Sequence, residues 1–174
     1  MRITQKYLDE LTYEIIGAAI EVHKHLGPGL LESAYHKCFL HELFLRGLKY
    51  ESQRNVTLNY KEMAVDTDLR YDVLVEDQIV TELKSTEGIA LVHQFITLTY
   101  MRFLEKAKGV IINFNVTNIF KEGQKTLVND LYAKTSPRMI PMCLRRTCVQ
   151  PTSIKQIHGS KRLHIEENLP KLTY

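Results

Sequence analysis

Residues 68–84 read DLRYDVLVEDQIVTELK, and their pattern defines the centre of the expected fold. Apolar and polar side chains alternate on either side of a polar cluster at 76–78. Such alternation is typical of β-strands, and a polar cluster between two alternating runs indicates a turn. The stretch therefore predicts two antiparallel strands, over 65–75 and 78–84.

The register of this hairpin brings three charged side chains together. If 76–78 form a three-residue turn, Asp72 lies directly opposite Glu82, with Cβ atoms roughly 4.5–5.5 Å apart. Because side chains alternate along a strand, Lys84 points to the same face as Glu82. The apolar side chains between them are expected on the other face, against a helix: Val73, Val75, Val80 and Leu83.

Two carboxylates at that distance repel each other, and each resists ionisation unless a cation lies between them. Oxygen ligands suit Mg²⁺ or Mn²⁺, which keep water in their coordination shell and bind substrate phosphate. A nearby ammonium, here that of Lys84, is suited to positioning a water molecule or to stabilising charge on a phosphate. By spacing alone, the alternative is a solvated cluster of ion pairs on a polar sheet face.

The segments around this hairpin predict a mixed α/β fold. Apolar residues three and four apart predict helices over 5–26 and 30–43, separated by Gly27-Pro28-Gly29, where neither glycine nor proline favours helix continuation. A further strand is expected over 55–60, a helix over 89–106 and a buried strand over 109–115. The order ααβββαβ predicts a mixed β-sheet flanked by helices.

Length and composition are those of an ordinary soluble domain. The chain has 174 residues, of which 44% are hydrophobic and 25% charged. No apolar run reaches the length of a membrane span and the N-terminus has no signal-peptide core, so a cytoplasmic protein without membrane contact is expected. Three cysteines at irregular spacing favour free thiols.

Charge divides the chain into two parts. Residues 1–132 carry 15 basic and 18 acidic side chains, whereas residues 133–174 carry 8 and 2 together with four of the five prolines. We therefore expect a domain over 1–132 and a basic, proline-containing extension over 133–174. Its cations are suited to non-specific phosphate contacts, and a disordered or loosely packed extension is an equal alternative. A Cys and His spacing in the extension, at Cys143, Cys148, His158 and His164, superficially resembles a zinc pattern, but free thiols are favoured.

Several of these motifs together resemble a known family. The run GPGLLESAY at 27–35 is similar to the signature of the GxxExxY proteins, which are assigned to the PD-(D/E)XK nuclease superfamily. Downstream, Asp72 and the sequence Glu82-Leu83-Lys84 resemble the acidic and ExK motifs of that superfamily. The similarity continues from His93 to Tyr100 and over 109–114, in family order.

This resemblance implies a restriction-endonuclease-like core with a metal site. Asp72 and Glu82 would be metal ligands, Lys84 the catalytic lysine, and Glu32 the acidic residue that completes the site. From the residues alone, Glu32 interrupts an apolar helix stripe, so it needs a partner or a metal, or is stabilised by the helix N-terminus. Residues that would position the substrate are Tyr35, Arg70, His93 and Tyr100. Tyr35 can equally be a core aromatic, and His93 a capping or packing residue.

One position departs from the family pattern. Relatives usually carry Gln four residues before Tyr100, where this chain has Ile96, and Gln94 falls on another face of the helix.

Two hypotheses for the function follow from these observations. The first is an Mg²⁺- or Mn²⁺-dependent nuclease acting on DNA or RNA; the second is a catalytically silent module that binds nucleic acid or a protein partner. A hydrolase for another phosphate ester and assembly into a homo-oligomer also remain open.

Overall fold

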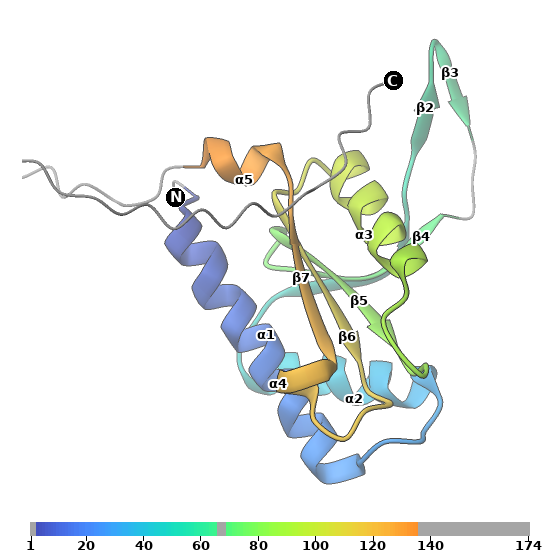
Figure 1. The fold of residues 1–174 in the computed structure, drawn as a ribbon. Coiled ribbons are helices and arrows are strands. Elements are labelled where there is room, and N and C mark those ends of the chain that lie inside the picture. The colour runs from blue at the N-terminus through green and yellow to red at the C-terminus, as the bar shows by residue number, and fades with distance from the viewer. Residues whose placement is uncertain (1–2, 66–68, 136–174) are drawn as a thin grey trace, which may run out of the picture. The chain divides into compact units, whose positions relative to one another are not determined.

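A five-stranded mixed sheet lies at the centre of the computed structural model, which describes residues 3–65 and 69–135 (Figure 1). The strand order is β1-β4-β5-β6-β7, and every pair is antiparallel except β5 with β6. A separate two-stranded hairpin is formed by β2 and β3. The strands are β1 (Tyr50–Asn55), β2 (Leu58–Tyr60), β3 (Met63–Val65), β4 (Arg70–Val75), β5 (Ile79–Lys84), β6 (Lys108–Asn113) and β7 (Gln124–Val128).

Helices cover both faces of the sheet. Leu8, Ile15 and Phe39 pack with inward side chains of the strands in the larger apolar core, so α1 and α2 lie on one face. On the other face, Tyr100 and Met101 of α3 pack in a smaller cluster. The helices are α1 (Gln5–Leu26), α2 (Glu32–Leu45), α3 (Leu91–Phe103), α4 (Ile119–Glu122) and α5 (Asp130–Lys134). The fold is thus a mixed α/β sandwich, as the sequence predicts.

The central hairpin has the expected register. Val75 pairs with Ile79 and Val73 with Thr81, so residues 76–78 form the three-residue turn. Of the four apolar residues expected on the face opposite Glu82, Val80 was assigned wrongly. It packs against α3 in the smaller core cluster, because strand alternation places it on the same face as Glu82.

The end of α1 shows why two glycines are needed there. Gly27 has φ 68° and Gly29 has φ 97°, which L-residues with a Cβ rarely adopt. The Gly27 amide donates to the carbonyl of His23 and closes the helix. This turn redirects the chain into α2, which crosses behind the lower end of α1 in Figure 1 and packs in the same apolar core.

The edges of the sheet differ from the prediction. The strand expected over 55–60 is divided between β1 and the hairpin, and β4 begins only at Arg70. No strand was expected at 50–55 or at 124–128, because neither β1 nor β7 has a clear apolar alternation. Both are edge strands with largely accessible side chains, so burial imposes no pattern on them.

The remaining sequence predictions concern the ends and surface of the chain. All described residues belong to one compact unit, and α5 continues to Lys134. Residues 136–174, which include most of the predicted basic extension and its Cys and His spacing, lie outside the described residues. Cys38 is an exposed free thiol. No helix within 3–65 or 69–135 is long and apolar enough to cross a membrane.

Candidate active site

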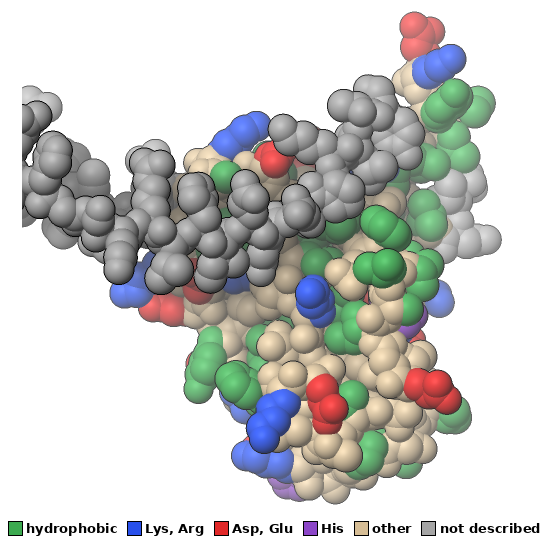
Figure 2. All heavy atoms as spheres, in the orientation of Figure 1, with side chains coloured by type: hydrophobic (Ala, Val, Ile, Leu, Met, Phe, Trp, Pro, Cys, Tyr) green, Lys and Arg blue, Asp and Glu red, His purple; other side chains and the backbone are tan. Residues whose placement is uncertain are grey.

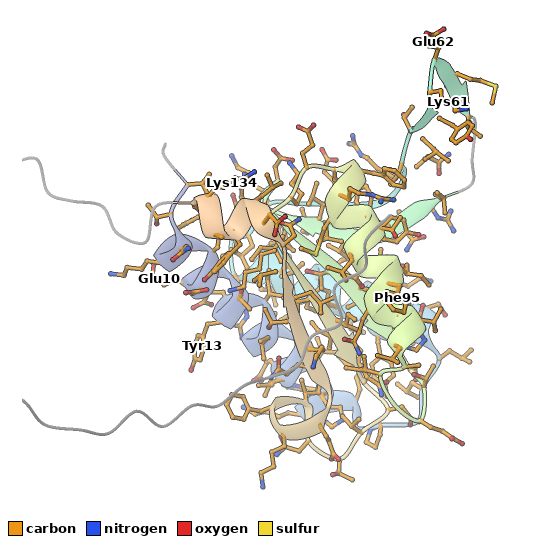
Figure 3. The ribbon with its side chains drawn as sticks, turned by 45° about the horizontal axis from the view of Figure 1, so that its top comes forward. Glu10, Tyr13, Lys61, Glu62, Phe95 and Lys134 are labelled. Carbon is orange, nitrogen blue, oxygen red and sulfur yellow. The ribbon has the colours of Figure 1, made fainter. Side chains whose placement is uncertain are left out.

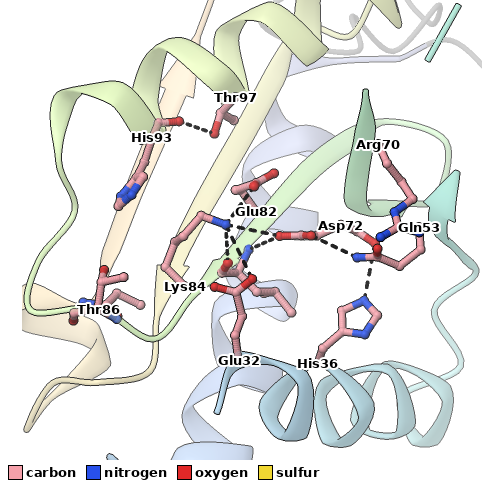
Figure 4. Close-up of polar contacts among 12 residues, drawn as sticks. Glu32, His36, Gln53, Arg70, Asp72, Glu82, Lys84, Thr86, His93 and Thr97 are labelled. Atoms are coloured by element: carbon pink, nitrogen blue, oxygen red, sulfur yellow. Dashed lines mark hydrogen bonds and ion pairs between the residues drawn. The ribbon is translucent and has the colours of Figure 1, made fainter. Parts of the chain in front are cut away.

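The site lies where β4 and β5 separate. Their ladder ends at the pair Val73 and Thr81, so beyond it the strands no longer exchange backbone hydrogen bonds. Just past this last pair lie Asp72 on β4 and, on β5, Glu82 and Lys84. All three point into the same region, together with Glu32 from the first turn of α2 (Figure 4).

The Lys84 ammonium contacts all three carboxylates. Its Nζ lies 2.8 Å from Glu82 Oε1, 3.6 Å from Asp72 Oδ2 and 3.8 Å from Glu32 Oε1. The Lys84 and Asp72 side chains are each 14% exposed, the Glu82 side chain 7% and the Glu32 side chain 44%. The four side chains therefore form a mostly buried charge cluster with Glu32 on its solvent side. The convergence expected from the strand register is present.

Glu82 is the most deeply buried carboxylate of this cluster. Burial raises the pKa of Glu82, the negative charge of Asp72 raises it further, and Lys84 only partly offsets both, which leaves the pKa at about 7. Its Oε2 atom is buried without a hydrogen-bond partner among the described residues. A buried carboxylate oxygen without a partner is costly, so this atom is suited to binding a further cation or donor.

Lys84 keeps its proton in this environment. Burial alone lowers the pKa of a lysine, but the charges and hydrogen bond of Glu82, with Asp72 and Glu32, outweigh that effect and raise the pKa of Lys84 above its ordinary value. Nζ also donates to the Leu83 carbonyl at 2.6 Å. Lys84 is therefore a fixed cation here and not a general base.

The loop before α2 brings Glu32 to the end of β5. Ser85, which directly follows Lys84, donates its hydroxyl to the Leu30 carbonyl at 2.6 Å. The Tyr35 hydroxyl donates to the Gly27 carbonyl at 2.5 Å and accepts from the Leu30 amide at 3.1 Å. These bonds fix both ends of the glycine turn, and the position of Glu32 follows from them.

Tyr35 itself is a core residue. Its side chain is fully buried, and its ring stacks on that of Phe114 with a centroid separation of 4.5 Å. Its hydroxyl is satisfied by loop backbone and does not line the cleft. Tyr35 thus has the contacts of a core aromatic, which the sequence analysis gave as the alternative to substrate positioning.

The other predicted positioning residues fall into two groups. Arg70 and Tyr100 line the cleft, and the Tyr100 hydroxyl donates to the Arg70 carbonyl at 3.0 Å. His93 instead caps α3, because its Nδ1 accepts from the Ala90 amide at 3.2 Å. Ile96, at the position of the family's Gln, is 37% exposed on α3.

The cleft beside the charge cluster has a volume of about 530 Å³. Besides Glu32, Asp72, Arg70 and Tyr100, its lining includes four polar residues that were not predicted, namely Ser33, His36, Lys37 and Gln53. A signal for His36 exists in the sequence, because it lies one helical turn after Glu32 and so shares its face. Gln53 lies on β1, whose sequence has no apolar alternation and gives no such signal.

The donors present fit a hard divalent cation. Asp72 and Glu82 supply carboxylate oxygens, which Mg²⁺ and Mn²⁺ prefer, and the unpartnered Glu82 Oε2 is one free donor atom. Within residues 3–65 and 69–135, no three His, Cys, Asp or Glu side chains are grouped closely enough to hold an ion as they stand. The Lys84 ammonium occupies the space between the carboxylates.

A five-stranded mixed sheet flanked by helices, with these residues at the end of its central hairpin, defines a restriction-endonuclease-like protein. The family model of the PD-(D/E)XK nuclease superfamily matches residues 9–126, and the chain belongs to this superfamily. No curated protein and no solved structure matches the chain.

Proposed function

We propose that this protein is a Mg²⁺- or Mn²⁺-dependent nuclease that hydrolyses phosphodiester bonds in DNA or RNA. The observation that carries the proposal is the cluster in which Lys84 meets three carboxylates from three elements beside an open cleft. A surface ion-pair cluster is the weaker interpretation, because Lys84, Asp72 and Glu82 are mostly buried.

Asp72 and Glu82 would hold the metal ion, and Glu32 would complete its ligand set from the solvent side. When bound, the ion would activate a water molecule and neutralise charge on the phosphate. Burial of Glu82 favours this role, since a divalent cation relieves the repulsion that raises its pKa.

Lys84 would act as an electrostatic catalyst. Its ammonium remains charged in this site, and it has hydrogen-bonding capacity for a water molecule or a phosphate oxygen. Because a protonated amine cannot accept a proton, Lys84 would orient the attacking water and stabilise charge on the phosphate. We expect its removal to lower the rate more than the metal affinity.

Two cations favour a nucleic-acid substrate. Lys37 of α2 and Arg70 of β4 both line the cleft, and neither has an acidic partner in the described part of the chain. Cations without an acidic partner beside a cleft are available for phosphate groups. They would hold the backbone of the substrate next to the carboxylates.

We also place the chain with the GxxExxY proteins inside the superfamily. The support is the sequence of residues 27–35 and the role of Tyr35, whose hydroxyl holds the loop that presents Glu32. The spacing of this motif thus has a physical reason in this chain, since Gly29 and Tyr35 shape the turn that leads to Glu32. The cytoplasmic location expected from the sequence stays a prediction.

The second candidate function is a silent module that binds nucleic acid or a protein partner. It is favoured by the outer face of α3, where four large apolar side chains are accessible: Leu91, Val92, Phe95 and Ile96. Phe95 points away from the sheet (Figure 3), and hydrophobic side chains gather over α3 and the β2–β3 hairpin (Figure 2). Accessible apolar patches often mark interaction surfaces, including those between copies of one chain.

Calorimetric titration with Mg²⁺ and Mn²⁺, together with cleavage assays on single-stranded DNA, duplex DNA and RNA, tests the proposal. We expect the wild type to bind one of the ions and to cleave at least one substrate. Glu82→Gln removes a ligand charge at nearly constant volume, and we expect it to abolish both. Lys84→Ala should lower the cleavage rate at least 100-fold and change metal affinity far less.

Glu10→Gln is the matched control, because Glu10 is an exposed carboxylate of α1 that pairs only with Lys6 among the described residues. It should behave as the wild type. Cleavage by purified Glu82→Gln at the wild-type rate would contradict the assigned site. Nucleic-acid binding without metal binding or cleavage in the wild type would replace the nuclease by the silent module.

A further inference from the structure

Gln53 has an unusual backbone conformation for its place in the sheet. Its φ is 55°, in the left-handed region, although it lies in the middle of β1. The other described non-glycine residues with positive φ are in turns between elements, namely Lys61, Glu76, Asp77 and Glu105. The left-handed region is unfavourable for an L-residue with a side chain, so this conformation persists where the surroundings require it.

The register shows what lies opposite this residue. Ser52 pairs with Val73 and Arg54 pairs with Tyr71, so Gln53 occupies the position opposite Asp72. That one pair is missing from an otherwise continuous ladder. The left-handed turn of the backbone removes Gln53 from the ladder while its flanking residues stay paired.

The side chain of Gln53 uses this freedom to reach the Asp72 carboxylate. Its Nε2 donates to Asp72 Oδ1 at 3.0 Å, and the Leu83 amide donates to Asp72 Oδ2 at 2.9 Å (Figure 4). The Leu83 amide faces the carboxylate because the β4–β5 ladder has already ended at Thr81. Each oxygen of the Asp72 carboxylate thus accepts one hydrogen bond, Oδ1 from β1 and Oδ2 from β5.

These two donors fix the orientation of Asp72 without neutralising it. An ionised carboxylate only accepts hydrogen bonds, so Gln53 must present its NH₂ group, and each Asp72 oxygen keeps a lone pair for a further ligand. Both donors are uncharged, whereas a Lys or Arg at position 53 would compete with a metal ion for the carboxylate.

A second contact strengthens the same part of β1. The Ser52 hydroxyl donates to the Asp72 backbone carbonyl at 3.0 Å, and the His36 ring nitrogen Nε2 lies 2.9 Å from that hydroxyl. His36 belongs to α2, the helix that carries Glu32. Ser52 of β1 therefore links this helix to the backbone of Asp72. The backbone of Asp72 is held by Ser52 and its side chain by Gln53.

We propose that Gln53 is a positioning residue that fixes the Asp72 carboxylate in the orientation needed to bind the divalent cation. The role rests on the proposed metal function of Asp72 and adds a residue that touches neither metal nor substrate. It also gives a reason for the left-handed backbone, since an extended residue at position 53 would continue the ladder. Partners that orient a metal-binding carboxylate typically change metal affinity 10–100-fold.

Gln53→Gly and Gln53→Asn separate this role from a purely structural one. Gly and Asn both tolerate positive φ, so we expect the melting temperature to stay within a few degrees of the wild type. Gly removes the amide that donates to Asp72, and Asn shortens the side chain by one methylene. Affinity for Mg²⁺ alone, measured by calorimetry, should fall at least 10-fold. Gln124→Asn, on β7 and away from the site, is the control and should bind Mg²⁺ as the wild type does.

The Leu83 amide proton gives a readout that needs no metal. A hydrogen bond to a carboxylate moves an amide proton downfield, so release of Asp72 in the Gln53 variants should move the Leu83 resonance upfield in metal-free protein. Unchanged Leu83 resonance and unchanged Mg²⁺ affinity would overturn the proposal. If the wild type binds no metal, the proposed function fails. The Leu83 resonance then decides alone whether Gln53 positions Asp72.

Discussion

At the scale of single residues, Glu82 is where burial and charge compete most directly. It contacts Lys84 at 2.8 Å, yet burial and the charge of Asp72 keep its pKa at about 7. Lys84 therefore does not fully compensate the carboxylates around it. A site with an excess of buried negative charge is the environment in which a divalent cation binds with most gain.

The raised pKa of Glu82 predicts a particular dependence of stability on pH in metal-free protein. Between about pH 4.5 and pH 7 the folded state binds a proton that the unfolded state releases, so this stabilisation is complete below pH 4.5 and is lost as pH rises through about 7. Glu82→Gln cannot titrate. We expect the free energy of unfolding of Glu82→Gln, relative to the wild type, to rise by about 1–3 kcal/mol from pH 5 to pH 8.

Urea unfolding in EDTA at the two pH values measures this difference. Glu10→Gln controls for general effects of removing a carboxylate, and it should show no such change because Glu10 is exposed. A difference between Glu82→Gln and wild type that stays constant from pH 5 to pH 8 would contradict the raised pKa.

At the scale of elements, the glycine turn between α1 and α2 is built by side chains from outside it. Tyr35 holds its two ends at Gly27 and Leu30, and Ser85 attaches it to the end of β5. Helix α3 packs closely on the sheet at Gly109 of β6. A Cβ at this position would lie 2.7 Å from the Met101 sulfur and 2.9 Å from a Thr97 methyl group. Small residues and one aromatic hydroxyl thus determine how the helices meet the strands.

Removal of the Tyr35 hydroxyl tests its role in this turn. Tyr35→Phe keeps the ring stacked on Phe114 but leaves the Gly27 carbonyl and the Leu30 amide without that partner. We expect a loss of about 1–3 kcal/mol in the free energy of unfolding, measured with urea. Tyr13→Phe is the control, since Tyr13 is 73% exposed. An unchanged stability combined with weaker substrate binding would instead support the substrate-positioning role.

At the scale of the whole molecule, alternation and periodicity predicted the centre of the fold. Successive side chains of β4 and β5 point to opposite sheet faces, and the register that places Asp72 opposite Glu82 followed from a three-residue turn. Helix α1 was equally clear, because Leu8, Leu11 and Ile15 form one apolar stripe.

The parts that sequence reasoning missed are those that burial does not constrain. β1 and β7 are edge strands, and the short helices α4 and α5 begin directly after Asn118 and Asn129, whose side chains cap them. Gln53 could not be predicted as part of the site. Its contact with Asp72 depends on a left-handed backbone and on a strand pairing between residues far apart in the sequence.

The charge distribution predicts a separable role for the C-terminal residues. Residues 1–135 carry 16 basic and 18 acidic side chains, whereas residues 136–174 carry 7 and 2. We therefore expect a negatively charged nucleic acid to be repelled at long range by the first part, and the second to offset that repulsion. A chain ending at Thr135 retains α5, whose Tyr132 contacts Gln5 and Asp9 of α1, so the described fold stays intact.

We expect this truncation to weaken binding of duplex DNA at low salt and to flatten its dependence on salt. Each phosphate contact contributes about 0.9 to the slope of log affinity against log salt concentration, so the lost contacts can be counted from the change in slope. Fluorescence anisotropy at several salt concentrations measures it, and calorimetry with Mg²⁺ should show the same metal affinity in both chains, since Asp72 and Glu82 are retained. Equal affinity and equal slope would exclude a nucleic-acid role for residues 136–174. Loss of metal binding or of solubility would show that the core depends on these residues.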